Sequence, residues 1–309
     1  MQTFSIAIHG GAGTLVKGMM TPELEIEYNS ALSVALEAGY EILNSGGSAV
    51  EAVERSVVLL EDSPLFNAGK GSVFTAEGSH EMDASIMDGL SLNAGAVTLI
   101  TGIKNPISLA RDVMEKSDFV FLAGKGALQF AETLNYKIED ERYFYDEFRH
   151  QQWLDIKDST DFQLDHSTKK DSKFGTVGAV ACDMKGNLAA ATSTGGMTNK
   201  RFGRVGDSPI IGSGTYANNH TCAVSCTGNG EFFIRAVAAY DVACLIEYGG
   251  LSLEQASQKV IYERMIRING EGGLIAVDAK GHIAMPFNSE GMYRASKTSE
   301  GEEIIAIYK

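Results

Sequence analysis

One junction constrains the fold of this chain more than any other feature: the step from Gly175 to Thr176. Residues 169–173, which precede it, are charged and polar and have no apolar periodicity, as is typical of an exposed linker. Residues 177–182, which follow it, are small and apolar and predict a buried strand. A cut before Thr176 would place a hydroxyl and a free α-amine on the first residue of that strand. One residue would then supply both a nucleophile and its base.

The overall composition indicates a globular chain and argues against two kinds of partner. The 309 residues allow one large domain or two small ones, and 44% of them are hydrophobic, enough for a sizeable core. A net charge of −14 argues against nucleic acid, because no basic patch can dominate the field. No run of about 18 apolar residues predicts a membrane span. The first residues lack the pattern of a signal peptide, so we expect a cytoplasmic protein.

The cysteines and the glycine-rich loops do not indicate a metal or nucleotide site. All four cysteines lie in apolar runs and are expected to be small buried side chains. Cys222 and Cys226 would lie roughly 13 Å apart along a strand, too far for one zinc ion. Residues 11–13 lack the third glycine of a dinucleotide-binding loop, and in residues 67–72 a glycine follows the lysine where a phosphate-binding loop needs Ser or Thr.

The periodicity predicts a mixture of helices and strands. The expected strands are residues 4–8, 81–89, 94–100, 177–182, 188–193 and 222–226, with a late hairpin of 273–278 and 282–285. The expected helices are residues 22–45, 48–60, 106–115, 126–134 and 232–247, with another from about 252. Residues 9–13 and 60–72 are expected as loops, and residues 139–173 as irregular chain. Two sheets stacked face to face, with helices outside both, would satisfy this order.

The starts of two expected helices carry capping residues. Thr21 precedes Pro22, which suits the first position of a helix because proline lacks an N–H. Ser48 and Glu51 have the spacing of a capping box, in which each side chain satisfies a backbone donor of the other residue. These two helices would follow one strand directly, which argues against a simple alternation of strand and helix.

Three polar residues stand out without a decided role. His9 lies beside Gly10 and Gly11, where it can be either a structural or a catalytic group. Asp83 and Asp88 lie in an apolar context and can be hydrogen-bonded core acids or site groups; their spacing does not decide. No serine occupies the G-x-S-x-G motif of a hydrolase elbow.

Three later segments contain polar groups that can act together with Thr176. The strand expected at 188–193 is followed by Thr194 and two glycines, so it ends in hydroxyl groups. Arg204 and Asp207 place opposite charges three residues apart, as the carboxylate and ammonium of an amino acid require. Residues 227–230 open a helix, so their backbone N–H groups can stabilise a developing oxyanion.

Together these segments resemble the plant-type L-asparaginase and isoaspartyl peptidase family of N-terminal-nucleophile hydrolases. The resemblance covers nearly the whole chain. It is carried by His9-Gly10-Gly11-Ala12-Gly13, Pro64-Leu65-Phe66-Asn67-Ala68-Gly69, Glu81-Met82-Asp83-Ala84, Gly175-Thr176-Val177-Gly178-Ala179-Val180, Ser193-Thr194-Gly195-Gly196, Gly203-Arg204-Val205-Gly206-Asp207-Ser208 and Pro286-Phe287-Asn288-Ser289-Glu290-Gly291-Met292.

This resemblance implies an architecture and a maturation step. The implied fold is a single α+β domain over residues 1–309, built as a four-layer αββα sandwich. Autocleavage between Gly175 and Thr176 would give an α chain of residues 1–175, with a mobile linker at about 150–175, and a β chain of residues 176–309. The two chains would assemble as an (αβ)₂ dimer of heterodimers.

The resemblance also implies the chemical roles. Thr176 would be the nucleophile and its freed α-amine the base, with Thr194 as its hydrogen-bonding partner and Asn67 nearby. A free α-amine has a reference pKa of about 7.7–8.0, so a useful fraction is neutral near pH 7.5. Thr227 and Gly228 would form the oxyanion hole. The chemistry needs no cofactor.

The implied substrates are isoaspartyl (β-aspartyl) dipeptides and L-asparagine, from which L-aspartate is released. Arg204 would bind the substrate α-carboxylate and Asp207 its α-ammonium. Gly228, Gly230 and Asn67 would also contact the substrate. Both substrates present the same two groups, so one site can serve both. The expected partners are thus small molecules and a second copy of the heterodimer, with no nucleic acid and no membrane.

The resemblance further implies a sodium ion held by backbone carbonyls of one loop. Carbonyl ligands tolerate different side chains, although a nearby lysine ammonium opposes a cation. The carbonyls belong to Leu60, Glu61, Ser63, Phe66, Ala68 and Lys70.

Two kinds of alternative remain open. Within the same fold, a glycosylasparaginase would act on sugar-linked asparagine and a threonine aspartase would cut proteins; Gly175 and residues 203–208 favour the isoaspartyl enzymes. Outside this class, the chain can be an inactive binding module for β-aspartyl groups. Such a module need not cut itself, so self-cleavage distinguishes the two.

Overall fold

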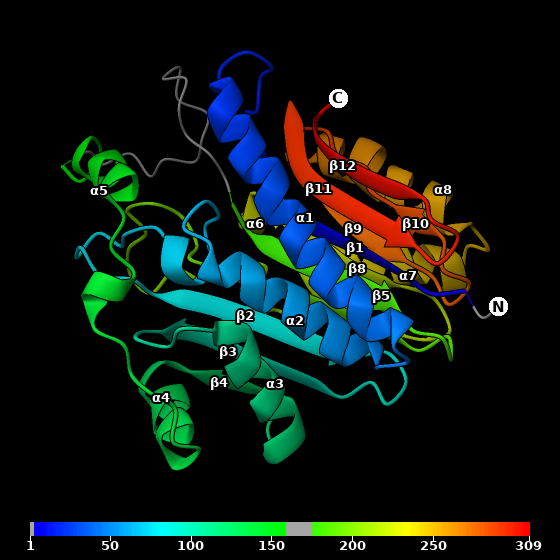
Figure 1. Cartoon of the computed structure of the whole chain (residues 1–309), viewed down its shortest axis with the longest axis horizontal. Helices are drawn as coiled ribbons and strands as arrows, with labels where there is room; N and C mark the ends of the chain where they lie inside the picture. Colours follow the sequence, from blue (N-terminus) through cyan, green and yellow to red (C-terminus); the bar gives the residue numbers. More distant parts are fainter. Residues whose placement is uncertain (1–2, 159–174) are drawn as a thin grey trace.

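The computed structural model describes residues 3–158 and 175–309 (Figure 1). The strands are β1 Ser5–Gly13, β2 Met82–Asp88, β3 Ala94–Ile100, β4 Phe121–Ala123, β5 Val177–Cys182, β6 Leu188–Thr194, β7 Thr215–Ala217, β8 Ala223–Gly228, β9 Gly272–Val277, β10 Ile283–Ala284, β11 Gly291–Thr298 and β12 Glu303–Tyr308. The helices are α1 Pro22–Asn44, α2 Ala49–Asp62, α3 Pro106–Lys116, α4 Gly124–Thr133, α5 Glu147–Leu154, α6 Gly230–Ala236, α7 Ala238–Glu247 and α8 Leu253–Lys259.

The strands form two sheets, and the chain is an α+β protein. The larger sheet has eight strands in the order β12-β11-β1-β5-β6-β2-β3-β4, and the smaller has four in the order β10-β9-β8-β7. All pairs are antiparallel except β3 with β4. In the larger sheet β1 lies between β11 and β5, so strands from before and after Thr176 pair directly.

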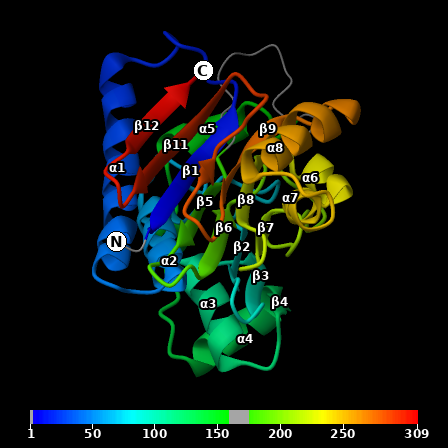
Figure 2. The ribbon, with the colours of Figure 1, turned by 90° about the vertical axis from the view of Figure 1, so that its right-hand side faces the viewer.

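Three apolar cores show how these elements pack. Successive residues of β1 face opposite ways: Ile6 and Ile8 contribute to a core shared with α1, α2 and α3, whereas Ala7 lies in a second core. The second core joins β1, β5 and β6 to Ile275 and Val277 of the smaller sheet. A third core packs β8 and β9 against α6, α7 and α8. Figures 1 and 2 show α1 and α2 over the larger sheet and α7 and α8 beside the smaller one.

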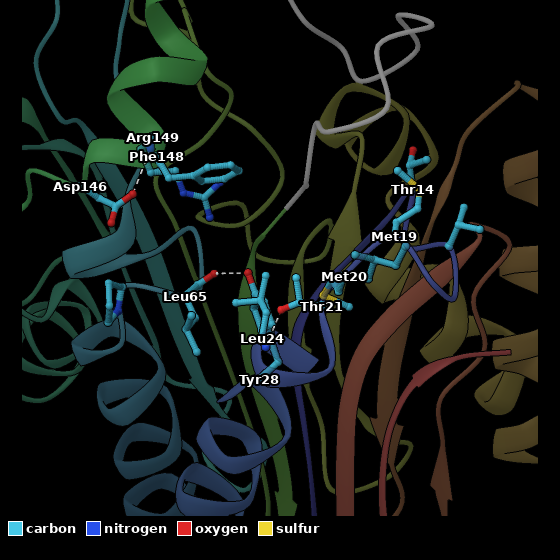
Figure 3. Close-up of a pocket in the computed structure, with 13 residues that line it drawn as sticks. Thr14, Met19, Met20, Thr21, Leu24, Tyr28, Leu65, Asp146, Phe148 and Arg149 are labelled. Carbon is cyan, nitrogen blue, oxygen red and sulfur yellow. Dashed lines mark hydrogen bonds between the residues drawn. The ribbon is translucent and has the colours of Figure 1, made fainter. Parts of the chain in front are cut away.

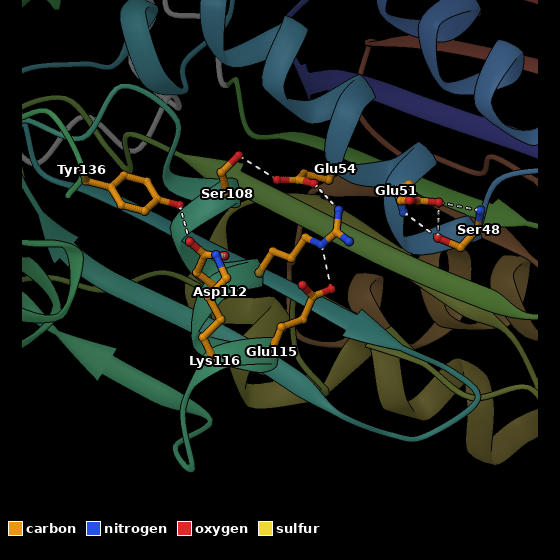
Figure 4. Close-up of polar contacts among 9 residues, drawn as sticks. Ser48, Glu51, Glu54, Ser108, Asp112, Glu115, Lys116 and Tyr136 are labelled. Atoms are coloured by element: carbon orange, nitrogen blue, oxygen red, sulfur yellow. Dashed lines mark hydrogen bonds and ion pairs between the residues drawn. The ribbon is translucent and has the colours of Figure 1, made fainter. Parts of the chain in front are cut away.

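The first two helices begin where their caps predict. Thr21 accepts a hydrogen bond from the backbone of Leu24, and Ser48 and Glu51 form both bonds of a capping box (Figure 4). Farther along α2, the carboxylate of Glu54 accepts a hydrogen bond from Arg111 of α3 at 2.6 Å. This pair joins the two helices across the face of the larger sheet.

The expected loop at residues 9–13 is wrong, because β1 continues through Gly13. A bulge between His9 and Gly11 keeps the strand paired with β11. A Cβ on Gly10 would lie 2.3 Å from the ring of Phe66, so the glycine is required by close packing. The glycines that suggested a loop therefore allow a strand to pass a buried aromatic ring.

Two helical predictions also need correction. Residues 232–247 do not form one helix: Val237, with φ at +49°, separates α6 from α7. The region from 139 to 173 is not wholly irregular, because Asp146 caps α5 and the helix extends over residues 150–154. A linker therefore does not begin at 150, and the rest of that prediction, over residues 159–174, lies outside the described residues.

The other predicted elements are confirmed within a few residues, while several strands went unpredicted. The expected helices at 106–115 and 126–134 correspond to α3 and α4, and the late hairpin to β9 and β10. β4, β7, β11 and β12 were missed. Within residues 3–158 and 175–309, no helix combines the length and apolarity needed to cross a bilayer. Three of the four cysteines are buried and Cys244 is half-buried; all are free thiols.

Candidate active site

Thr176 lies at the start of β5, next to the end of β6. Its hydroxyl donates a hydrogen bond to the hydroxyl oxygen of Thr194 at 3.2 Å. The same oxygen of Thr194 accepts the backbone N–H of Gly196 at 3.0 Å. Thr194 is buried, so its position is fixed by both the strand and the turn that follows. The structure thus brings together the two threonines that the sequence paired.

Asn67 is bonded to the turn that follows Thr194. Its amide nitrogen donates to the carbonyl of Gly196 at 2.7 Å, and its amide oxygen accepts the N–H of Val73 at 3.0 Å. A Cβ on Gly175 would lie 2.8 Å from the Asn67 backbone nitrogen. Only glycine fits at 175 without a shift of the chain, so Gly175, Thr176, Thr194 and Asn67 form one contact set.

His9 contacts the backbone of Thr176. Its Nδ1 lies 2.9 Å from the Thr176 carbonyl oxygen, and its Nε2 lies 2.9 Å from the hydroxyl of Ser225. Complete burial lowers the pKa of His9 to about 3, so the ring is neutral. A carbonyl oxygen only accepts, so Nδ1 carries the proton and Nε2 accepts from Ser225. This geometry supports an anchoring role for His9.

A row of buried hydroxyls continues from Ser225. Its oxygen lies 2.7 Å from the hydroxyl of Thr192, which in turn accepts from Thr215 at 2.6 Å. Ser85 lies 2.8 Å beyond Thr215. Sequence reasoning counted Thr192 among the hydroxyls at the end of its strand but missed Ser225, Thr215 and Ser85 as support for the site. One available sign was the alternation of Thr192 with Thr194 on β6, which places two hydroxyls on one face of a buried strand.

Arg204, Asp207 and Gly230 form a second cluster. A Cβ on Gly230 would lie 2.9 Å from Oδ1 of Asp207 and 3.0 Å from Nη2 of Arg204. Arg204 donates through Nε and Nη2 to both carboxylate oxygens of Glu231, at 2.9 and 2.8 Å. Glu231, which sequence reasoning missed, orients the guanidinium from the first turn of α6.

Asp207 is buried and incompletely bonded. Its Oδ2 atom has no hydrogen-bond partner in the described structure. Burial raises the pKa of Asp207 to about 7, and the nearby positive charge of Arg204 opposes this shift. A buried carboxyl oxygen with no partner suits a ligand that brings its own hydrogen-bond donor, such as an ammonium group.

Thr227 and Gly228 end β8, and Thr227 lies close to Ala12 near the end of β1. The Thr227 hydroxyl accepts the N–H of Ala12 at 3.2 Å and keeps its own proton for donation. Gly228 has φ at +145° and pairs with Gly272 of β9. A Cβ at Gly228 would lie 2.4 Å from a backbone oxygen of Glu271, so no larger residue fits this strand end.

The two acids that the sequence left undecided differ in the structure. Asp83 is buried and lies opposite Thr194 in the sheet. Its carboxylate accepts hydrogen bonds from the hydroxyl of Thr98 at 2.5 Å and from the backbone N–H of Leu99 at 2.9 Å. It is a hydrogen-bonded core acid beside the site. Asp88 accepts bonds from the turn at Leu90 and Ser91 and lies away from these clusters at the end of β2.

The loop after α2 gathers backbone carbonyls. A Cβ on Gly69 would lie 2.5 Å from the carbonyl oxygen of Glu61, and one on Gly71 would lie 2.1 Å from that of Phe66. Glycine at 69 and 71 therefore lets the backbone pass close to these two oxygens, where a side chain would collide with them. The Lys70 ammonium lies 5.9 Å from the centre of the Tyr143 ring. Three of the six expected carbonyls, those of Leu60, Phe66 and Ala68, each accept one backbone N–H.

The side chain of Glu61, in the last turn of α2 just before this loop, is a separate feature. Its carboxyl accepts hydrogen bonds from the hydroxyl of Ser193 at 2.6 Å and from the backbone N–H of Ile107 at 3.0 Å. Burial raises the pKa of Glu61 to about 8, so at neutral pH the carboxyl is mostly protonated. Ser193 precedes Thr194, so the last turn of α2 is bonded directly to β6, the strand that holds the nucleophile's partner.

Comparison with known proteins matches residues 1–307 to the family described as asparaginase. The isoaspartyl peptidase of Salmonella typhimurium is 52% identical over 307 residues, covering 98% of each chain. That of Escherichia coli is also 52% identical, covering 98% of this chain and 96% of its own. The human isoaspartyl peptidase/L-asparaginase is 43% identical over 288 residues, covering 93% of this chain and 91% of its own.

Proposed function

Because this chain belongs to the asparaginase family, we propose that it is an autoprocessing threonine hydrolase that releases L-aspartate from β-aspartyl dipeptides and L-asparagine. Relatives with these names match nearly the full length, and the chain is a hydrolase. The observation that carries the finer proposal is the hydrogen bond of 3.2 Å from Thr176 to Thr194, at a strand start directly after Gly175.

The first reaction is self-cleavage. The Thr176 hydroxyl attacks the Gly175 carbonyl carbon, and the acyl group moves from the Thr176 nitrogen to its oxygen. Water then hydrolyses the ester and leaves a carboxylate on Gly175 and a free amine on Thr176. The products are chains of residues 1–175 and 176–309, which we propose form an (αβ)₂ assembly with the four-layer αββα architecture of N-terminal-nucleophile hydrolases. The three cores support that architecture.

The second reaction uses the new N-terminus. The free amine takes the proton of the Thr176 hydroxyl, which attacks the side-chain carbonyl of the bound aspartyl group. Thr227 and Gly228 stabilise the oxyanion, and loss of one such donor commonly costs about 3 kcal/mol. Ammonia or a peptide amine leaves, and water releases aspartate from Thr176. Arg204 holds the substrate α-carboxylate and Asp207 its α-ammonium.

A sodium ion in the loop after α2 is part of the proposal. Carbonyls of Leu60, Glu61, Ser63, Phe66, Ala68 and Lys70 would hold it. When bound, the ion would supply no chemistry and would fix the loop that carries Asn67. Backbone carbonyl oxygens are ligands that hard cations prefer, which supports this ligand type.

Intact mass spectrometry of the purified protein tests the proposal. We expect two fragments that meet between Gly175 and Thr176, and hydrolysis of both substrates by the cleaved protein. Thr176→Ala should remain at 33.1 kDa and be inactive. Thr133→Ala, an exposed change on α4, is the matched control and should cleave as the unmodified chain does. Two fragments from Thr176→Ala would refute the assignment.

The same measurements separate the alternatives. A chain that stays whole and hydrolyses no substrate would support a binding module for β-aspartyl groups. A cleaved chain that acts on sugar-linked asparagine or on proteins, and on neither proposed substrate, would support a glycosylasparaginase or a threonine aspartase.

A further inference from the structure

A row of buried hydroxyls ends at the loop that carries Arg204 and Asp207, here called the substrate clamp. Ser85 donates a hydrogen bond to the backbone carbonyl oxygen of Ser208 at 2.6 Å, and Ser208 directly follows the clamp. At its other end the row meets His9, which contacts the backbone carbonyl of the nucleophile. The hydroxyl row consists of Ser225, Thr192, Thr215 and Ser85. A continuous path of hydrogen bonds therefore connects the clamp loop with the nucleophile.

The hydroxyl row alternates between the two sheets. Ser85 of β2 and Thr192 of β6 belong to the larger sheet. Thr215 of β7 and Ser225 of β8 belong to the smaller sheet. Each of the three bonds within the row, between 2.6 and 2.8 Å long, thus crosses from one sheet to the other, and the bond from Ser225 to His9 of β1 crosses once more. The row fastens the sheets together along the path from the clamp to the nucleophile.

His9 fixes the direction of the protons in the row. Its Nε2 accepts from Ser225, because its Nδ1 carries the proton that bonds the nucleophile's carbonyl. A hydroxyl has one proton to donate, so Ser225 accepts from Thr192, and Thr192 accepts from Thr215. Ser85 shares its proton between the hydroxyl of Thr215 at 2.8 Å and the clamp-loop carbonyl. Hydrogen bonds aligned in this way polarise one another, so the loss of one weakens the others.

The packing around the row leaves room for these bonds and keeps solvent out. A Cβ on Gly178 would lie 2.0 Å from the hydroxyl oxygen of Ser225 and 2.5 Å from Nε2 of His9. All four residues of the row are fully buried. The cavity of about 400 Å³ that Figure 3 shows lies between α5 and the start of α1, and no residue of the row lines it. A bond lost from the row is therefore not replaced by surface water.

We propose that the hydroxyl row sets the distance between the substrate clamp and the nucleophile, and that Ser85 and Thr215 are positioning residues for hydrolysis. This inference rests on the proposed function. The clamp lies in the segment that leads to β7 of the smaller sheet, whereas Thr176 lies at the start of β5 of the larger sheet. Their distance thus depends on how the two sheets are fastened. A displacement of about 1 Å between bound substrate and nucleophile can cost about a hundredfold in rate.

Replacing the two ends of the row separates the two reactions. In Ser85→Ala we expect kcat for L-asparagine to fall about tenfold, because the clamp still captures the substrate but holds it out of line. KM should stay within about threefold, and self-cleavage, which does not use the clamp, should keep its rate. Ser225→Ala removes the donor to His9 and should slow both reactions. The matched control is Ser56→Ala, whose buried hydroxyl donates to the Ala35 carbonyl between α1 and α2; both rates should be unchanged.

Two changes at Thr215 distinguish its hydrogen bonds from its packing. Thr215→Val keeps the shape and loses the hydroxyl, so kcat should fall as in Ser85→Ala. Thr215→Ser keeps the hydroxyl and should restore kcat. A serine variant as impaired as the valine variant, or parallel losses of self-cleavage and hydrolysis in Ser85→Ala, would mean a structural role and would overturn the proposal. A kcat that is unchanged in Ser85→Ala, with or without a higher KM, would also overturn it.

A stability measurement keeps this inference separate from the proposed function. If the row acts as one unit, Ser85→Ala combined with Ser225→Ala should lower the free energy of unfolding in urea by less than the sum of the two single losses. Ser85→Ala combined with Ser56→Ala, which is not connected to the row, should show additive losses. A protein that neither cleaves itself nor hydrolyses substrate would refute the proposed function, and this comparison would still test the row. Additive losses for Ser85 and Ser225 would overturn it.

Discussion

His9 and Thr176 are joined by a bond between a ring nitrogen and a backbone carbonyl, 2.9 Å long. The bond holds the nucleophile by its main chain and leaves the hydroxyl of Thr176 free for Thr194. His9 is in turn bonded to Ser225 of the smaller sheet. The position of the nucleophile thus depends on both sheets.

We expect His9→Leu to weaken the fold and slow self-cleavage. It removes the donor to the Thr176 carbonyl and the acceptor for the Ser225 hydroxyl proton, at about 1–3 kcal/mol each. Loss of alignment should slow the appearance of fragments by about tenfold or more. Urea unfolding and timed mass spectrometry measure both effects. The exposed His220→Leu is the control; equal cleavage rates in the two variants would show that the anchor is dispensable.

Replacing Thr194 by valine tests the hydroxyl that accepts from the nucleophile. The shape is kept while the acceptor for Thr176 and for the Gly196 N–H is lost. We expect kcat to fall by about ten- to a hundredfold, as for a hydrogen bond to a group that gains charge. Thr221→Val changes another buried threonine outside the site and should leave kcat near its original value. A Thr194→Val enzyme with unaltered kcat would remove Thr194 from the mechanism.

Much of the fold could be predicted because local chemistry decided it. The caps at Thr21 and Ser48 fix two helix starts, and the apolar runs of β3, β5 and β6 fix three central strands. The missed strands β11 and β12 contain charged residues on partly exposed faces, so their sequences do not read as buried strands. The pairing of β11 with β1, and so the place of β12 beyond it, is a long-range property.

The candidate site also contains some features that local sequence predicts and others that depend on long-range contacts. Thr176 and Thr194 could be named from sequence, since each lies at the end of a recognisable strand. The contact of Glu231 with Arg204 and the bond from His9 to Ser225 could not, because each depends on how distant segments approach. Periodicity gives the face of a strand on which a residue lies, not its partner across the core.

Gly230→Ala should separate the two reactions. The added methyl group would occupy the space between Asp207 and Arg204, where the substrate's charged groups are expected to bind. Self-cleavage does not use these groups, so fragments should form at the normal rate while KM for L-asparagine rises by about a hundredfold or more. Gly126→Ala, which has open space around its Cβ, is the control. If Gly230→Ala blocks cleavage and hydrolysis alike, the glycine supports the fold rather than the substrate.

The buried carboxyl of Asp207 makes stability depend on pH in a direction that can be worked out. Its pKa is 3.8 in an unperturbed chain and about 7 in the folded protein. Between these values the folded state holds a proton that the unfolded state has lost, so this group makes the free energy of unfolding fall as pH rises from about 4 to 7.

Asp207→Asn cannot titrate, so its stability relative to the unmodified protein should increase over the same pH range, by roughly 2–4 kcal/mol. The raised pKa of Glu61 also makes the free energy of unfolding fall as pH rises. Glu61 is present in both proteins, so its effect cancels from the difference between their free energies of unfolding. Urea unfolding of both proteins at pH 4, 5.5, 7 and 8 measures this difference in the free energy of unfolding. The exposed change Asp155→Asn is the control. A difference that stays constant with pH would mean that Asp207 is ionised throughout in the folded protein.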